Sequence, residues 1–469
     1  MSAFTRGALF GGFAFGLLGA GIFACSTTTT LGRFEEQPDS GANLPPSGSE
    51  DASPPRSNDA GEDASFVVPD GGVACDATPC VVALSGGGSS FCALLQSGKV
   101  ACWGNNGSGQ LGSDPGDFPT VSAPREIDGL DGVTHVSVNG VNGCARVSDG
   151  GVFCWGDADL VNLAHAFVPD DTADPPFGPV PPTREDLLPA AATIEVGPQV
   201  ACITTATGAL SCWGRNESSQ LGRGPTQEYL APPAEVTKGA LAGKSVVQAS
   251  SGDSQTFAIL AGGELASWGR NGQPSFSGYF LGRDTSEDPD PMPALVPGVK
   301  QVRAVAGSFS HACAIAGRYV ECWGYNDQGQ LGRGWFGSLS ALPDRSTVGF
   351  VAEAEDAGTA DGADVPLGIA LGLNHTCAAL GGGRVYCWGG NDDGQLGTDP
   401  TTTTRTGQPS YVEGLSGPAV AVAAAMTTTC ALLRNGTVEC WGSNYGGELG
   451  IGTVDSDRHP HPARVSFAP

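Results

Sequence analysis

Short apolar segments separated by glycine-bearing turns recur from about residue 80 to the C-terminus. Segments of this length, bounded by turn residues, are typical of β-strands. Each repeat of the pattern reaches a Trp-Gly pair, and these seven tryptophans are Trp103, Trp155, Trp213, Trp268, Trp323, Trp388 and Trp441. Their spacing of 52 to 65 residues predicts a propeller or solenoid.

Each repeat has room for about four short antiparallel strands. Trp-Gly is followed by a turn and the motif Gly-Gln-Leu-Gly, as at 109–112, 329–332 and 394–397, and then by segments such as APREIDGLDGVTHVSVNG that read as two more strands. Since one such blade cannot bury both of its faces, seven blades should pack around an axis. The predicted fold class is all-β, a seven-bladed β-propeller of four-stranded blades over residues 75–469.

The ends of the predicted propeller suggest how the ring closes. The first repeat begins near Val81 and lacks a leading strand, whereas the C-terminal HPARVSFAP resembles that strand. We therefore expect residues 462–467 to complete the first blade and remove its open edge.

Cysteines occur in pairs just before Trp-Gly. The pairs are Cys92 with Cys102, Cys144 with Cys154, Cys202 with Cys212, Cys313 with Cys322, Cys377 with Cys387, and Cys430 with Cys440. The repeat at Trp268 has Phe257 and Ser267 instead, so it has lost both cysteines together. This coupled absence indicates a bond within each repeat, which a metal site or a catalytic thiol would not explain.

The turns between the paired cysteines support this interpretation. Residues ten apart face each other across a hairpin with a three-residue loop, whose third position favours glycine. Glycine is third in six of the loops, as at Gly98 and Gly436. Where the cysteines are nine apart, the loop is Gly317-Arg318, a two-residue turn that keeps the register. We predict one disulfide across each hairpin, formed in an oxidising compartment.

Three cysteines remain outside these pairs. Cys75 and Cys80, in CDATPC, most simply close a small loop before the first strand, with a two-cysteine metal site as the alternative. Cys25 follows a single early charge, Arg6, and an uncharged apolar stretch. That order resembles a bacterial lipoprotein signal, and it predicts a signal peptide over 1–24 and lipidation at Cys25. An uncleaved membrane anchor is the alternative.

Residues 25–74 are rich in Ser, Thr, Pro and acidic residues and have few apolar ones. Such a segment cannot bury enough surface to fold, so it predicts a disordered tether between the membrane and the propeller. The whole chain of 469 residues has 49 acidic against 23 basic side chains, a net charge of −26. This charge argues against nucleic acid as a partner, and against membrane contact other than through the lipid anchor.

The repeats resemble the regulator of chromosome condensation repeat family. The residues that carry the resemblance are HACAIAGRYVECWGYNDQGQLG from His311 and HTCAALGGGRVYCWGGNDDGQLG from His375. The resemblance covers about 390 residues and implies a seven-bladed β-propeller. It also implies two kinds of function known in the family, nucleotide exchange with docking on nucleosomes, and inhibition of β-lactamases by secreted bacterial members.

No residue pattern predicts a catalytic site, a metal site or a cofactor. His311 and His375 occupy a mostly polar position of the repeat, where a bond to backbone within the blade is the simplest role. The acidic stretches NDDGQLG and EDPDPM do not match a calcium-binding loop, although they could take a hard cation.

Irregular loops are the better candidates for function. One spans 157–189; a second spans 333–366 and carries Trp335 and Phe336; a third carries Phe276, Tyr279 and Phe280. All three follow a Trp-Gly strand, so we expect them to share one face and to offer aromatic anchors for a partner. Insertion without a partner is the alternative.

Together these features predict a non-enzymatic, lipid-anchored protein of the bacterial cell envelope, periplasmic or at the surface, whose propeller binds a macromolecule, most simply a protein. Two other functions remain open: a polysaccharide-active enzyme with carboxylates or histidines at the axial mouth, and nucleotide exchange on a small GTPase.

Overall fold

The computed structural model describes residues 25–26, 72–157, 179–225, 229–272, 280–337, 340–345 and 365–467. The predicted signal peptide over 1–24 and most of the predicted tether lie outside these residues. Cys25 belongs to a two-residue strand, β1 (Cys25–Ser26), which pairs with Gly86 and Gly87. Among the described residues, no helix is long and apolar enough to cross a membrane.

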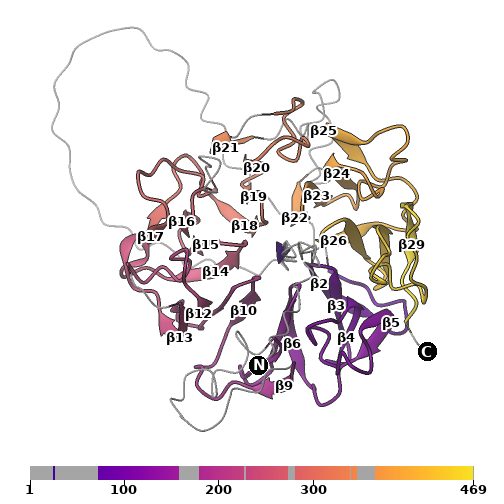
Figure 1. The fold of residues 1–469 in the computed structure, drawn as a ribbon, viewed down its shortest axis with the longest axis horizontal. Coiled ribbons are helices and arrows are strands. Elements are labelled where there is room, and N and C mark those ends of the chain that lie inside the picture. The colour runs from indigo at the N-terminus through magenta and orange to yellow at the C-terminus, as the bar shows by residue number, and fades with distance from the viewer. Residues whose placement is uncertain are drawn as a thin grey trace, which may run out of the picture.

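The chain folds as the predicted seven-bladed β-propeller, with seven sheets arranged around one axis (Figure 1). Within each blade the four strands follow one another in sequence order and pair antiparallel. The first three blades are β2 (Val81–Gly87), β3 (Ser90–Leu95), β4 (Val100–Asn105) and β5 (Thr120–Glu126); β6 (Val133–Val138), β7 (Asn142–Val147), β8 (Val152–Gly156) and β9 (Val180–Arg184); and β10 (Thr193–Val196), β11 (Val200–Thr204), β12 (Leu210–Arg215) and β13 (Leu230–Glu235). A short 3-10 helix, η1 (Gly239–Leu241), follows β13.

The remaining four blades repeat the same order. They are β14 (Val246–Ser251), β15 (Gln255–Leu260), β16 (Leu265–Gly269) and β17 (Asp290–Leu295); β18 (Val302–Gly307), β19 (His311–Ala316), β20 (Tyr319–Gly324) and β21 (Ser340–Arg345); β22 (Pro366–Leu371), β23 (His375–Leu380), β24 (Val385–Gly390) and β25 (Arg405–Tyr411); and β26 (Ala419–Ala424), β27 (Thr428–Leu433), β28 (Val438–Gly442) and β29 (His459–Arg464).

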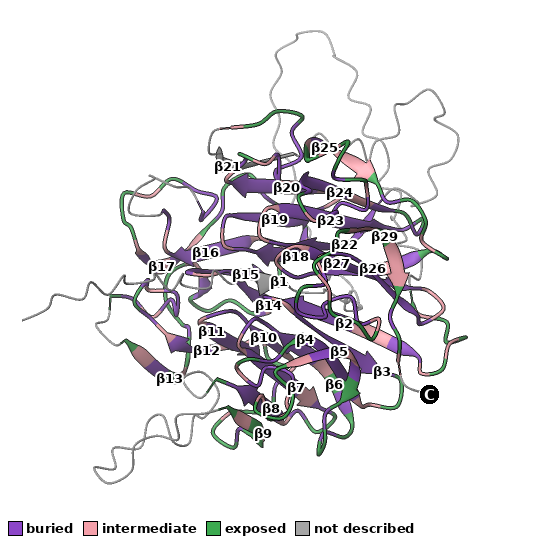
Figure 2. Ribbon diagram, turned by 45° about the vertical axis from the view of Figure 1, so that its right-hand side comes forward, coloured by how far each residue is buried: buried purple, intermediate pink, exposed green. Residues whose placement is uncertain are grey.

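Burial is highest in the second strand of a blade and lowest in the fourth strand, at the rim (Figure 2). Second strands such as β3 and β27 are buried at every residue. The fourth strand β5 mixes buried and exposed positions, and β29 has only partly buried and exposed ones. Every fourth strand contains proline, as in HPHPAR of β29. Because proline lacks the N–H needed for further pairing, it protects the exposed edge of each sheet from adding another strand.

The paired cysteines lie opposite one another and form disulfides. The bridges across the hairpins join Cys92 to Cys102, Cys144 to Cys154, Cys202 to Cys212, Cys313 to Cys322, Cys377 to Cys387, and Cys430 to Cys440, with Cα atoms 4.0 to 4.1 Å apart. In the nine-residue case the register still sets Cys313 opposite Cys322. Cys75 and Cys80 form the seventh bridge.

The seven repeat tryptophans are fully buried between neighbouring blades. The indole N–H of Trp388 donates to the backbone oxygen of Gln330 in the preceding blade, at 2.9 Å, and Trp155 and Trp441 make the same bond to Gln110 and Gln395. The glutamine of Gly-Gln-Leu-Gly therefore presents its carbonyl to the next tryptophan. This explains why the two motifs recur together.

The expectation that residues 462–467 complete the first blade is wrong. These residues belong to or follow β29, which pairs with β28 and completes the seventh blade. In a cyclic repeat, the boundary between blades can be drawn before any strand. The sequence prediction assigned each fourth strand to the start of the next blade, whereas in the structure it ends its own blade.

The ring closes instead with the contacts used between other blades. The indole of Trp103 donates to the backbone oxygen of Glu448, at 2.8 Å, and the N–H of Val81 donates to the oxygen of Gly436, at 3.0 Å. The segment before Val81 adds a bond from the N–H of Ala74 to the oxygen of Arg434, at 2.6 Å. The loop closed by Cys75 and Cys80 thus packs on the hairpin of the seventh blade.

Candidate functional site

The blades present two different faces. Ser90, at the start of β3, pairs with Gly104 near the end of β4, so first-to-second turns and third-to-fourth connections lie at the same end of a blade. We call this end the loop face. The other end, the hairpin face, carries the second-to-third turns with the disulfide hairpins and the connections from one blade to the next.

The three predicted insertions are only partly on one face. The predicted insertion 157–189 is divided by the fourth strand β9, so its residues after Arg184 lie at the hairpin face. Residues 158–178 and 273–279 connect third to fourth strands, so their attachment points lie on the loop face, although the segments themselves lie outside the described residues. The segment 333–366 is not a single loop, because β21 (Ser340–Arg345) divides it. Its first part lies on the loop face, whereas residues 346–364, outside the described part, leave β21 at the hairpin face.

Exposed aromatic side chains gather on the loop face. Six aromatic residues are exposed in the described part of the chain, and those on third-to-fourth connections are Phe118, Tyr229, Trp335, Phe336 and Tyr445. Tyr411, at the end of β25, is the one on the hairpin face. Aromatic side chains that are exposed on a rigid scaffold are typical anchors of protein interfaces.

Trp335 and Phe336 are held outward by backbone contacts. The side-chain amide of Asn326 donates to the backbone oxygen of Trp335 at 2.8 Å, and the N–H of Gly334 donates to the oxygen of Gly407 in the next blade, at 2.8 Å. The guanidinium of Arg405 lies 4.7 Å from the ring centre of Phe336. The rings remain 43% and 45% exposed on a segment fixed to two blades.

Phe280 does not belong to this exposed set. Its side chain is only 3% exposed and packs 5.5 Å from the ring of Tyr325, and its backbone oxygen accepts the indole N–H of Trp323 at 2.9 Å. Phe280 therefore replaces the glutamine of Gly-Gln-Leu-Gly, since Leu281 and Gly282 follow it. Phe276 and Tyr279, predicted with it, lie outside the described residues.

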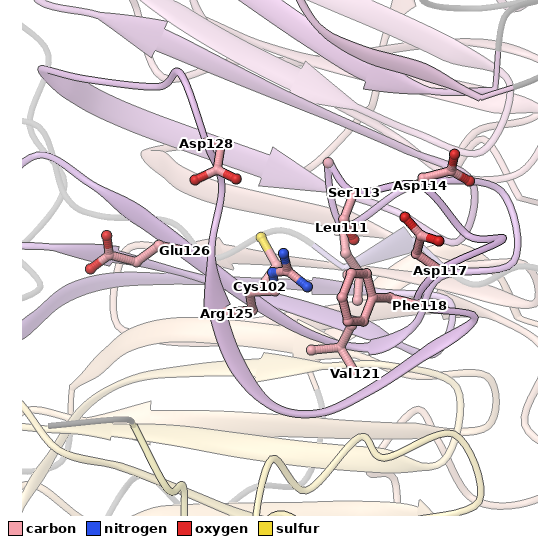
Figure 3. Close-up of a pocket in the computed structure, with 11 residues that line it drawn as sticks. Cys102, Leu111, Ser113, Asp114, Asp117, Phe118, Val121, Arg125, Glu126 and Asp128 are labelled. Carbon is pink, nitrogen blue, oxygen red and sulfur yellow. The ribbon is translucent and has the colours of Figure 1, made fainter.

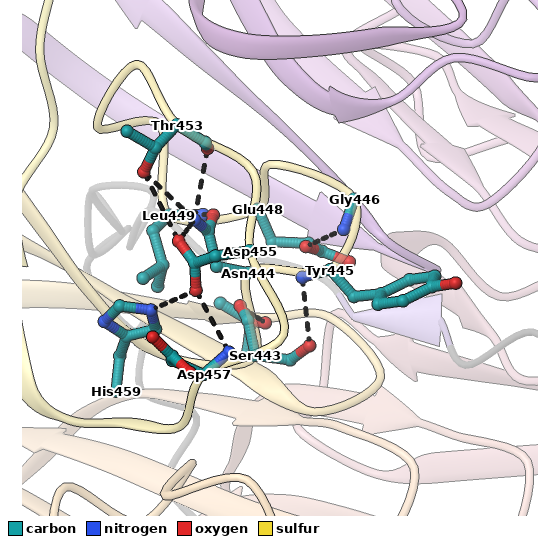
Figure 4. A network of polar contacts seen from close by, with 11 residues as sticks. Ser443, Asn444, Tyr445, Gly446, Glu448, Leu449, Thr453, Asp455, Asp457 and His459 are labelled. Atoms are coloured by element: carbon teal, nitrogen blue, oxygen red, sulfur yellow. Dashed lines mark hydrogen bonds and ion pairs between the residues drawn. The ribbon is translucent and has the colours of Figure 1, made fainter.

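Tyr445 is a candidate that the sequence interpretation missed. Its ring is 78% exposed and points away from a polar network that fixes the loop around it (Figure 4). In that network, Asp455 accepts from the amide of Asn444 at 2.8 Å and pairs with His459 at 2.7 Å. Hydrogen bonding to His459 holds the pKa of Asp455 below its usual value. The sequence pattern that could have indicated Tyr445 is the order Trp-Gly-x-Asn-aromatic at 441–445.

Charge also differs between the faces. In the described part of the chain, the exposed acidic residues of the loop face are Asp114, Asp117, Asp157, Glu217, Asp284, Glu287, Asp288, Asp327, Asp392, Asp399 and Asp457, and its exposed basic residues are Arg405 and Arg458. On the hairpin face the exposed acidic residues Asp76, Glu126, Asp128, Asp131, Asp149, Asp186, Glu235 and Glu413 are balanced by Arg125, Arg184, Lys238, Lys244, Lys300, Arg318, Arg384 and Arg464. The loop face is thus strongly negative, and the hairpin face has little net charge.

A small pocket of about 170 Å³ lies at the rim of the first blade (Figure 3). Phe118 lines it, with the guanidinium of Arg125 stacked 3.8 Å from the ring centre, and Asp114 and Asp117 lie beside them. Because Arg125 already covers the ring, the pocket shows no built site for a small molecule. Among the described residues, no group of three or more histidine, cysteine or acidic side chains could hold a metal ion.

The two repeat histidines join neighbouring blades rather than bonding to backbone within their own. His311 Nε2 lies 2.8 Å from the hydroxyl of Thr376, and His375 Nε2 lies 2.9 Å from that of Thr429. Each threonine hydroxyl donates onward to a glutamine carbonyl, so the histidine Nε2 acts as the donor. Burial lowers the pKa of both imidazoles to about 3, so both are neutral structural groups.

A titratable pair lies between the second and third blades, with Glu195 buried and His135 partly exposed. Glu195 on β10 approaches His135 on β6, with Oε1 4.0 Å from Nε2, and the hydroxyl of Ser137 lies 3.4 Å from its other oxygen. Burial raises the pKa of Glu195 to about 8, and burial with the nearby Arg146 lowers the pKa of His135 to about 4. Both side chains are therefore neutral near pH 7.

Comparison with known proteins identifies the repeat. Two models described as the regulator of chromosome condensation (RCC1) repeat match this chain, one at residues 207–259 and 382–432 and the other at 81–110 and 368–395. The chain is 32% identical over 354 residues to the E3 ubiquitin-protein ligase HERC2 of Homo sapiens, covering 72% of this chain and only 6% of HERC2. It is 26% identical over 385 residues to the ultraviolet-B receptor UVR8 of Arabidopsis thaliana, covering 72% of this chain and 82% of UVR8.

Solved structures agree on the fold. Prp20p of Saccharomyces cerevisiae superposes with a TM-score of 0.64 at 21% identity, covering 78% of this chain and 86% of that one. Human WBSCR16 gives the same TM-score at 22% identity, covering 76% and 88%. Residues 81–110, 207–259 and 368–432 of this chain therefore match the regulator of chromosome condensation repeat, and the chain has the same propeller fold as these solved structures.

Proposed function

We propose that this protein is a non-enzymatic lipoprotein of the bacterial cell envelope that presents the loop face of its propeller to a protein partner. The observation that carries the proposal is the placement of Trp335, Phe336 and Tyr445 on one face of a scaffold stiffened by disulfides. Interfaces draw most of their binding energy from a few such aromatic anchors.

Relatives of known behaviour support a binding role. The reported structure of Prp20p concerns its binding to Gsp1p and histones, and another reports yeast RCC1 (Prp20) bound to Kap60. Gsp1p, histones and Kap60 are named as partners of Prp20p, not of this chain. For this chain, the seven disulfides are consistent with export, because such bonds persist in oxidising compartments.

Photo-crosslinking in intact cells tests the proposal. A crosslinking amino acid at Asp327, exposed on the loop face, should capture a protein identifiable by mass spectrometry, whereas the same group at Lys300, exposed on the hairpin face, should not. Capture from neither position, or equal capture from both, would contradict the proposal.

The anchor is tested separately. In cells supplied with an alkyne-labelled fatty acid, the parent chain should carry the label and Cys25→Ser should not, because the replacement removes the residue that would be lipidated. An unlabelled parent chain, or equal labelling of the variant, would contradict lipidation at Cys25.

A further inference from the structure

We propose that one sector of the loop face binds a protein segment rich in arginine and lysine. This sector, the acidic aromatic sector, consists of Asp327, Trp335, Asp392, Asp399 and Tyr445 on blades 5 to 7. The inference rests on the proposed function and specifies the chemistry of the partner.

The loops of these three blades form one continuous surface. Gly329 in the fifth blade lies close to the backbone of Gly407 in the sixth. A Cβ atom added to Gly329 would lie 2.7 Å from the Cα of Gly407. Gly394 in the sixth blade approaches Pro460 in the seventh in the same way, at 2.8 Å. A partner crossing from Trp335 to Tyr445 would therefore meet the carboxylates of the sixth blade between them.

Several exposed rings attached to the loop face already have a cation beside them, and for Phe118 this cation is Arg125, which reaches the ring at the rim from the hairpin end of β5. Besides Phe118 and Phe336, Tyr229 has a guanidinium near its ring, with Arg215 5.6 Å from the centre. Within the described part of the chain, no arginine or lysine stacks on Trp335 or Tyr445. These two rings are free to receive a cation from outside, and tryptophan is the strongest acceptor for that contact.

The surrounding charge selects a basic partner. Asp327, Asp392 and Asp399 are exposed, and hydrogen bonds from Thr401 lower the pKa of Asp399 and keep it ionised. Two exposed cations lie near these carboxylates. Arg405 is engaged with Phe336 and donates to the backbone oxygen of Asp327 at 2.8 Å, and Arg458, with His461, adds to the lowering of the pKa of Asp399. A surface of this charge attracts a polycation over a distance and repels an acidic segment.

The fluorescence of Trp335 can report whether a ligand binds next to it. It is the only tryptophan outside the Trp-Gly repeat, and the other seven are fully buried. Quenching of tryptophan emission by acrylamide, which is uncharged and leaves the ionic strength unchanged, should therefore report mainly on Trp335, and a ligand stacked on its ring should protect it.

The test uses the purified full-length chain with its disulfides intact and fluorescein-labelled octa-arginine, with octa-glutamate as the comparison peptide. Octa-arginine should bind with an affinity that falls steeply as salt is raised and should reduce acrylamide quenching, whereas octa-glutamate should do neither. The double variant Trp335→Ala/Tyr445→Ala should bind roughly tenfold more weakly, and Asp327→Asn/Asp392→Asn several-fold more weakly with a shallower salt dependence.

Matched variants on the other face provide the control. Tyr411 is 45% exposed on the hairpin face, and Glu413 lies beside it, so Tyr411→Ala/Glu413→Gln should leave binding unchanged. Equal weakening by this control, or no weakening by the loop-face variants, would overturn the inference and reduce the interaction to general charge attraction. If crosslinking at Asp327 captures a protein whose contacting segment is not basic, the proposed function survives and this inference fails; if Asp327 captures no protein, the proposed function itself fails.

Discussion

The fourth and sixth blades have the same strand order, yet different interactions hold their hairpins together. In the sixth blade, Cys377 and Cys387 join β23 to β24 covalently. In the fourth blade the same positions hold Phe257 and Ser267, which pair across the hairpin in the same register. The disulfide is therefore not what determines the shape of a blade.

Noncovalent contacts replace the bridge in the fourth blade. The ring of Phe257 packs edge-on against Trp323, with centres 5.6 Å apart. Arg283 donates to the hydroxyl and the backbone oxygen of Ser267, at 3.1 and 3.0 Å, and pairs with the buried carboxylate of Asp290 at 2.8 Å. Both blades keep the buried tryptophan and the register of the hairpin. The contact that joins the two strands differs, since it is a disulfide in one blade and a set of noncovalent contacts in the other.

The largest effect should come from the element that both blades share. Trp388→Ala removes a fully buried ring and its bond to Gln330, so unfolding should become easier by about 3–5 kcal/mol. Calorimetric melting of the variant measures the loss. Trp335→Ala, at the exposed tryptophan, should change stability by less than about 0.5 kcal/mol, and equal losses would refute the distinction between the two sites.

The next effect should appear where the fourth blade lacks its bridge. Arg283→Met leaves the buried carboxylate of Asp290 without its cation, at an expected cost of about 3 kcal/mol. The exposed Arg458→Met is the matched control and should be almost neutral. A melting temperature unchanged in Arg283→Met would mean that Phe257 alone replaces the bridge.

Removing a bridge should have a slightly smaller effect. Cys377→Ala/Cys387→Ala should cost roughly 2–3 kcal/mol, because the unfolded chain regains the freedom of a short loop. Denaturant unfolding with and without a reductant measures this. Reductant should destabilise the parent chain, which has seven disulfides, more than this variant, and an equal effect on both would show that this bridge contributes nothing.

At one position the third blade has a different residue from the first two blades, and the charge of this residue should make the stability of the fold depend on pH. It has Glu195 opposite Cys202, where the first and second blades have Ser85 and Ser137 opposite their cysteines. With a folded pKa of about 8 against 4.5 unfolded, Glu195 keeps its proton in the folded chain while the unfolded chain loses it, so stability should fall as pH rises between these values.

His135 acts in the opposite direction at lower pH. Its folded pKa of about 4, against 6.5 unfolded, makes stability rise with pH between those values, which opposes Glu195 there. From pH 6.5 to 8 Glu195 acts alone, for a loss of up to about 2 kcal/mol. Melting temperatures over this range should fall in the parent chain and stay level in Glu195→Gln; parallel slopes would exclude Glu195 as the cause.

The hairpins could be predicted from sequence because their information is local. Two cysteines ten residues apart, with glycine third in the loop, determine the turn, the register and the partner without reference to the rest of the chain. The blade number and the all-β class followed from the repeat for the same reason, since each Trp-Gly unit forms one sheet.

The errors concern contacts between distant residues. The position of β29 could not be predicted, because a cyclic repeat looks the same wherever it is divided. Phe280 follows an enlarged turn, which suggested an exposed loop, but Leu281 and Gly282 place it at the buried position that receives Trp323. Tyr445 was missed because its exposure depends on the loop that Asn444 and Asp455 hold beneath it.

The sequence by itself determined the strands, the turns, the cysteine pairing within hairpins and the number of blades, because residues close along the chain decide each of these. Only the tertiary structure decided how the ring closes, which aromatic rings face solvent, and that acidic side chains from seven loops gather on one face. Those properties arise when blades far apart in sequence are packed around one axis, and burial and electrostatic potential depend on neighbours in space.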